Sequence, residues 1–65
     1  MLYSVDLFDR TTGESVETWT EPTDFGIEGI ATRIQNELGG TIEYQKGEAL
    51  VTTSEWFAYH IRPAA

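Results

Sequence analysis

Few side chains in this 65-residue chain could support catalysis, and none has the neighbours that catalysis needs. His60 is the only histidine, so the paired spacing of histidine zinc ligands is missing. The chain has no cysteine, which excludes thiolate nucleophiles and thiolate metal ligands together. The serines Ser4, Ser15 and Ser54 lie outside the G-x-S-x-G setting of a hydrolase nucleophile.

A pair of carboxylates is the remaining route to hydrolysis, and it needs two acids held at a fixed separation in a cleft. Asp6 and Glu17 can meet across a predicted hairpin, but an open sheet gives them no cleft. The tripeptide Asp24-Phe25-Gly26 spells the metal-binding motif of protein kinases, yet no companion kinase motif is present. We therefore expect a non-catalytic protein with no cofactor and no metal site.

The charge balance is the strongest compositional feature of the chain. Eleven Asp and Glu residues oppose four Lys and Arg residues, which gives a net charge of −7. Binding to the phosphate backbone of a nucleic acid requires a basic surface, so direct nucleic-acid binding is not expected. An anionic membrane is disfavoured for the same reason. A basic protein partner, such as a nucleic-acid-binding protein, would instead be attracted.

The sequence predicts one small domain over residues 1–65. Alternating apolar and polar residues predict five strands, and apolar residues at steps of three and four predict one helix between them. The predicted strands are 2–9, 15–20, 41–45, 49–53 and 56–62, and the predicted helix lies within 24–40. The order β-β-α-β-β-β predicts a two-layer α+β fold, an antiparallel sheet with one helix packed on one face.

The predicted core combines the apolar stripe of the helix with one face of the strands. It comprises Tyr3, Val5, Leu7, Ile27, Ile30, Ile34, Leu38, Ile42, Tyr44, Val51, Phe57, Tyr59 and Ile61. At the helix start, Asp24 can serve as the N-cap. Alternatively, Thr23 is the N-cap and Asp24 occupies the first helical position. Gly26 and Gly29 indicate either a late or loose first turn or the close approach of another backbone.

Two regions remain open to alternative interpretation. In the first hairpin, Val16 and Trp19 have opposite parity, so only one can share the face of Leu7 without a bulge. For residues 56–62 a helix is the rival to a strand, because Ser54 could cap it. Aromatic and β-branched residues with a period of two favour the strand.

One helix can cover one sheet face but not both, so the second face is expected to be exposed. The sequence assigns Leu2, Phe8, Leu50, Trp56 and His60 to that face. Such an apolar surface would exceed what a monomer of this size normally exposes. This indicates either ordinary packing of amphipathic side chains on a small sheet or a contact surface for a target or a second copy. A structural or accessory protein that homodimerises through its sheet is one hypothesis for the contact surface.

At the level of class, the chain resembles the small, acidic, cysteine-free inhibitors encoded by phages and mobile elements, of which anti-CRISPR proteins are the best-known group. Its length, its acid excess around residues 9–28 and its single α+β unit carry this resemblance. It implies a cytoplasmic inhibitor, in the host cell if phage-encoded, that occupies a basic surface of a protein or nucleoprotein complex such as a CRISPR effector. Mimicry of DNA charge is one way to do so. The expected partner-binding residues are Asp9, Glu14, Glu17, Trp19, Glu21, Asp24, Glu28 and Trp56.

Overall fold

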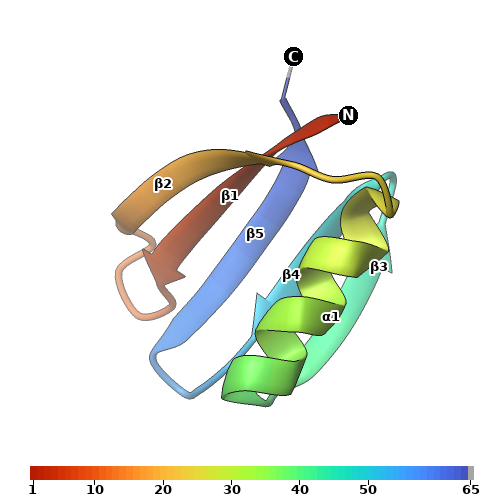
Figure 1. Cartoon of the computed structure of the whole chain (residues 1–65). Helices are drawn as coiled ribbons and strands as arrows, with labels where there is room; N and C mark the ends of the chain where they lie inside the picture. The colour runs from red at the N-terminus through yellow and green to blue at the C-terminus, as the bar shows by residue number, and fades with distance from the viewer. Residues whose placement is uncertain (65) are drawn as a thin grey trace.

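Alternating apolar residues form five strands, and the segment with a helical period forms the single helix. A computed structural model describes residues 1–64 of the chain, and it confirms the predicted α+β class and the order β-β-α-β-β-β. Figure 1 shows the helix packed against one face of a twisted sheet. The elements are β1 (Leu2–Asp9), β2 (Ser15–Pro22), α1 (Gly26–Leu38), β3 (Thr41–Gln45), β4 (Glu48–Thr52) and β5 (Phe57–Pro63).

The sheet is antiparallel throughout, with the strand order β2-β1-β5-β4-β3. The first and the last strand therefore pair at its centre, where Val5 lies opposite Ile61 and Leu7 lies opposite Tyr59. Residues 57–63 are a strand, so the helical alternative for this segment is wrong. β2 and β3 form the two edges of the sheet.

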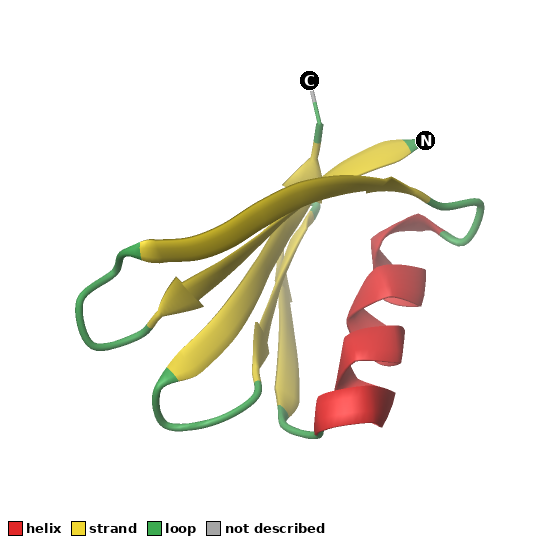
Figure 2. Ribbon diagram, turned by 60° about the vertical axis from the view of Figure 1, so that its left-hand side comes forward, coloured by secondary structure: helices red, strands yellow, loops and turns green. Residues whose placement is uncertain are grey.

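α1 packs against β3, β4 and β5, and it leaves most of β2 and the part of the sheet face around Leu7 uncovered (Figures 1 and 2). This follows from size, since a helix of 13 residues spans about 20 Å and lies along one half of a twisted sheet. No helix within residues 1–64 is long and apolar enough to span a membrane.

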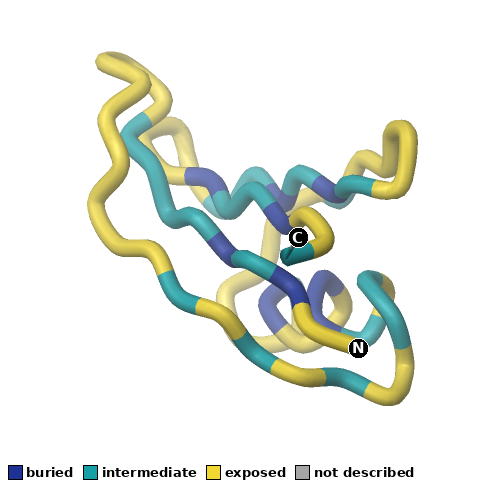
Figure 3. The backbone as a smooth tube through the Cα atoms, turned by 90° about the horizontal axis from the view of Figure 1, so that it is seen from above, coloured by how far each residue is buried: buried dark blue, intermediate teal, exposed yellow. Residues whose placement is uncertain are grey.

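The core lies between α1 and the central strands, as Figure 3 shows in dark blue. Val5, Val51 and Ile61 are fully buried, and Ile30 and Ile34 contribute the buried side of the helix. Three small residues that the predicted core omits are buried as well, namely Ala31, Ala49 and Ala58. Ala58 lies on the sheet face away from the helix, where Phe8 and Thr52 are its cross-strand neighbours.

Three predicted core residues are exposed, and their assignment to the core is wrong. Leu38 is 53% exposed, Tyr44 50% and Phe57 41%. Leu38 is the last residue of α1 and Phe57 is the first residue of β5, while Tyr44 lies on the edge strand β3. The periodic pattern places each residue on the correct face, but a terminal or edge position has fewer neighbours to cover it.

The first hairpin resolves the parity conflict between Val16 and Trp19 with a bulge. Trp19 lies opposite Val5, on the helix-facing side of the sheet, and Glu17 lies opposite Leu7. Phe8 then pairs with Ser15, so the register shifts between Leu7 and Phe8. Val16 is the extra residue of the bulge, and it lines the same hollow as Leu7 while Trp19 keeps its regular pairing with Val5.

The helix begins at Gly26, later than an N-cap at Asp24 requires. Phe25 occupies the N-cap position without a side-chain cap, so the assignment of the cap to Asp24 is wrong. A Cβ added at Gly29 would lie 2.8 Å from Cβ of Phe25. The close neighbour of Gly29 is therefore a side chain, not another backbone.

A close backbone approach does occur at Gly40, between α1 and β3. Its φ of +101° lies in a region that L side chains rarely adopt. A Cβ at this position would overlap the carbonyl oxygen of Thr52 and lie 2.9 Å from Cα of Thr53. Gly40 is therefore required both by its conformation and by lack of space.

We expect Gly40→Ala to lower the free energy of unfolding by about 3 kcal/mol or more, because it combines strain at positive φ with overlap against backbone. Gly47→Ala is the matched control. Gly47 also has a positive φ, +78°, but no atom lies within 4 Å of its added Cβ. Its cost should be the conformational part alone, about 1–2 kcal/mol. Urea denaturation compares the two, and equal losses would contradict the importance of the close approach.

Candidate protein-binding surface

The eight residues predicted to bind a partner lie in three separate places. Asp9 and Glu14 flank the β1–β2 turn, and Trp56 lies in the neighbouring β4–β5 connection rather than in a strand. The backbone N–H of Arg10 donates to the carbonyl of Trp56 (2.8 Å), which joins these two connections. Glu17, Trp19 and Glu21 project from the helix-facing side of β2, while Asp24 and Glu28 lie at the start of α1.

The carboxylates near the turns and connections do not gather at one end of the domain. Because the sheet is antiparallel, the β1–β2 turn lies at the end opposite the start of α1 (Figure 1). The β3–β4 turn with Glu48 lies at the same end as the start of α1. The carboxylates are thus distributed over both ends of the molecule. Asp9 and Glu14 do not form one acidic cluster with Asp24.

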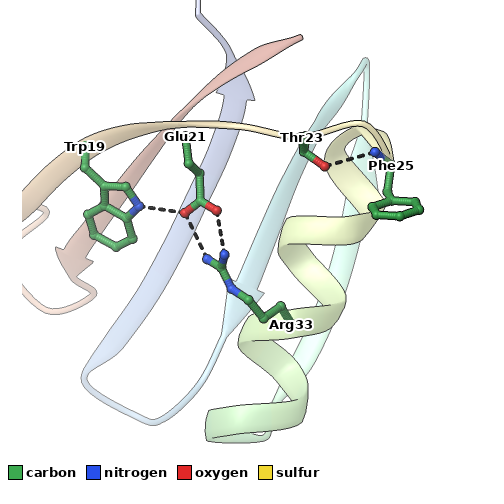
Figure 4. A network of polar contacts seen from close by, with 5 residues as sticks. All are labelled: Trp19, Glu21, Thr23, Phe25 and Arg33. Atoms are coloured by element: carbon green, nitrogen blue, oxygen red, sulfur yellow. Dashed lines mark hydrogen bonds and ion pairs between the residues drawn. The ribbon is translucent and has the colours of Figure 1, made fainter.

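Glu21 was predicted to contact a partner, but its carboxylate is bound within the chain by Arg33 and Trp19. Its carboxylate accepts hydrogen bonds from two nitrogens of the Arg33 guanidinium, at 2.6 and 2.9 Å. The indole N–H of Trp19 donates to the same carboxylate at 2.8 Å, as Figure 4 shows. The hydrogen bonds from Arg33 lower the pKa of Glu21, with partial burial acting against them. This network ties β2 to α1, so Glu21 stabilises the fold instead of remaining free.

Beside this tie, the uncovered part of the helix-facing side forms a groove. Its floor is Leu7, Phe57 and Tyr59 from β1 and β5, and its sides carry Val16 from β2 and Leu38 from α1. Val16 is 56% exposed and Leu38 is 53% exposed. We call these five residues the apolar groove. Trp19 contacts Tyr59 edge to face, with ring centroids 6.2 Å apart, so the aromatic cluster continues toward the tie.

Glu17 lies opposite Leu7, on the same sheet face as the apolar groove. None of the residues that line the groove is a carboxylate, and Glu37 lies on the outer side of α1 with Thr32 and Arg33. Glu55 lies in the connection that leads to Phe57. All three side chains are exposed. The nearby cation is Arg10, whose guanidinium donates to the carbonyls of Ser54 (2.9 Å) and Glu55 (3.4 Å). An apolar centre with a polar, charged rim is the usual anatomy of a protein interface.

Sequence reasoning assigned Leu38 and Phe57 to the core and so missed the groove. Their position at the ends of α1 and β5 was the available signal. It also missed Phe25, which is 85% exposed and held at the start of α1. The hydroxyl of Thr23 accepts a hydrogen bond from the Phe25 N–H at 3.0 Å (Figure 4).

The opposite sheet face mixes apolar and polar residues, and it carries Leu2, Phe8, Leu50 and His60 as predicted. The assignment of Trp56 to this face is wrong, because Trp56 lies in the β4–β5 connection and not in a strand. His60 Nε2 lies 2.6 Å from Glu48 Oε1. Asp6 accepts hydrogen bonds from the hydroxyls of Ser15 (2.5 Å) and Thr18 (3.1 Å). Asp6 and Glu17 project from opposite faces of the sheet and do not meet.

The titratable side chains of the described residues do not form a metal-binding cluster. Within residues 1–64, no three His, Asp or Glu side chains are close enough together to hold a metal ion. Comparison of the chain with protein-family models, curated proteins and solved structures found no match.

We expect Arg33→Met to lower the free energy of unfolding at neutral pH by about 1 kcal/mol, because it removes a partly exposed two-point ion pair. Since the pKa of Glu21 in the folded protein is lowered, the pair stabilises the fold above the ordinary value of 4.5. That stability is lost as the pH falls through the lower folded value. The difference between wild type and Arg33→Met should therefore vanish in acid.

Urea denaturation at neutral pH and well below pH 4.5 measures this difference. Arg62→Met is the control, since Arg62 forms no ion pair with a residue between 1 and 64. A difference that persists in acid would contradict the role of the Glu21 carboxylate.

Proposed function

We propose that the protein is a non-catalytic binding protein that occupies a basic surface of a partner protein. The observation that supports this most is the state of its carboxylates. Of the eleven acids, Glu21 pairs with Arg33 and Glu48 with His60, and the other nine have no basic side chain within 4 Å among residues 1–64. A surface with this much uncompensated negative charge attracts a positive one and repels nucleic acid.

The β1–β2 side of the molecule is the best placed to make the contact. Glu14 and Glu17 are exposed there and form no ion pair with any residue from 1 to 64, and Trp56 is 61% exposed in the adjacent connection. Tryptophan is among the residues that most often anchor interfaces. Asp9 lies there too, but its carboxylate accepts hydrogen bonds from the backbone N–H groups of Thr11 and Thr12, so it shapes the turn.

The class resemblance gives the proposal a more specific form, in which the partner is a nucleic-acid-binding host complex such as a CRISPR effector. The protein would then act as an inhibitor, because its carboxylates compete with phosphates for the same basic side chains. Contacts of this kind weaken as ionic strength rises.

The alternative hypothesis, a homodimer formed through the uncovered sheet face, has less support. That face carries Asp6, Glu43 and Glu48, while Trp19 faces the helix and Trp56 lies outside the strands. Two copies would bring like charges together. Sedimentation at high protein concentration distinguishes a monomer from such a dimer.

We expect the double variant Glu14→Lys/Glu17→Lys to lose partner binding while the fold is retained. The immobilised protein is exposed to a bacterial lysate at low and high salt, with and without excess duplex DNA. Wild type should retain a basic protein at low salt and release it when salt or DNA is added. The control Glu28→Lys/Glu43→Lys has the same charge change and should still bind, because Glu28 in α1 and Glu43 in β3 lie away from the β1–β2 side and Glu28 is then no part of the contact.

Equal retention by the two double variants would remove Glu14 and Glu17 from the contact. Retention that neither salt nor DNA reverses would contradict the proposed competition for a basic, nucleic-acid-binding surface. For the more specific form, DNA cleavage by purified, guide-loaded CRISPR effectors is measured with and without the protein. Unchanged cleavage across such a panel would reject that partner class.

A further inference from the structure

The apolar groove requires an explanation that charge alone does not provide. Val16, Leu38 and Phe57 are each 41–56% exposed, and they lie around one hollow rather than scattered over the surface. Isolated exposed apolar residues are normal, whereas a contiguous patch marks an interaction site. The groove lies beside Glu17, the acid that the proposed function uses.

We infer that the apolar groove receives an apolar side chain from a basic segment of the partner, such as a helix with leucine on one face and lysine or arginine around it. This inference rests on the proposed function and identifies the chemistry of its partner. Charge complementarity selects the occupant, because Glu17 lies opposite Leu7 on the sheet face of the groove, Glu55 lies in the connection beside Ser54, and the chain has a net charge of −7. Arg10 is the opposing charge, and it is engaged by two backbone carbonyls.

Two other occupants fit the groove less well. A second copy of this chain would bring a net charge of −7 against the same acids. The C-terminal segment lies at the other end of the molecule, where the Ala64 N–H donates to the Leu2 carbonyl at 3.0 Å. Figures 1 and 2 show this end of the chain away from the C-terminal end of α1. A basic segment with an apolar anchor is the occupant that matches both the shape and the charge.

The test uses two fluorescent synthetic peptides and the complete protein. The first peptide is a lysine-rich amphipathic helix with leucines along one face, and the second carries serine in place of each leucine. Fluorescence anisotropy measures affinity at low and high salt. Burial of one leucine is worth about 1.5–3 kcal/mol, so the leucine peptide should bind about tenfold or more tightly than the serine peptide. It should also keep more of its affinity in salt.

Leu38→Gln is the decisive variant, with Leu2→Gln as its matched control. The two leucines are 53% and 47% exposed, but Leu2 belongs to β1 outside the groove. Leu38→Gln should weaken binding of the leucine peptide about tenfold and leave the serine peptide unchanged. Leu2→Gln should change neither. Val16→Thr, which keeps a β-branched side chain, provides a second groove variant should Leu38→Gln fail to fold.

Equal affinity for the two peptides, or equal effects of Leu38→Gln and Leu2→Gln, would overturn the inference. Self-association of the protein that Leu38→Gln abolishes would also overturn it, since a second copy would then be the occupant. These outcomes are separate from failure of the proposed function. If Glu14→Lys/Glu17→Lys loses the basic partner while Leu38→Gln retains it, the proposed function stands and the groove has no part in it.

Discussion

The antiparallel pairing of β1 with β5 is the interaction on which the remaining structure depends. It joins the first and last strands at the centre of the sheet and buries Val5 opposite Ile61, both fully inaccessible to solvent. Without it, the β1–β2 hairpin and the β3–β4 hairpin with α1 would be separate pieces. The β1–β2 hairpin would then lack a second layer, the β3–β4 hairpin with α1 would lose Val5 and Ile61 from its core, and a chain of this size has little core to spare.

The candidate surface is a consequence of this arrangement. The single helix follows β2 and precedes β3, and it packs on the half of the sheet that contains β3, β4 and β5. Most of β2 and the neighbourhood of Leu7 on the same face are then left without a covering layer. The Glu21–Arg33 ion pair joins β2 to the helix at one point, and the apolar groove occupies the space beside it. Because the single helix covers only part of one sheet face, the core is small and the apolar groove stays exposed.

Local patterns in the sequence were sufficient to predict the elements and the face on which most residues lie. The apolar stripe with Ile30 and Ile34 and the alternating pattern of β5 are properties of single segments. The burial of the two isoleucines and the strand at β5 were therefore predicted correctly. Strand order could not be predicted, because it depends on pairings between distant segments. The exposure of Leu38 and Phe57 escaped prediction for a related reason, since it is set by where α1 stops relative to β5.

The candidate site divides in the same way. The acidic character of the surface was evident from composition, whereas the positions of the carboxylates required the topology. Glu21 shows the difference most clearly. It was predicted to bind a partner, but its partner is Arg33, twelve residues away on the helix. Only a structure that places β2 beside α1 distinguishes this carboxylate from Glu14 or Glu17, which have no such neighbour.

The central position of β5 also governs when this protein can acquire its structure during synthesis. β1 cannot pair with β5 until the helix and all the other strands, β5 included, have been translated. Until β5 has left the ribosome, the nascent chain exposes one unpaired edge of β1 and another of β4. Long-range pairings of this kind fold slowly and offer those edges to other chains in the meantime. The net negative charge of the chain makes such incompletely folded molecules repel one another.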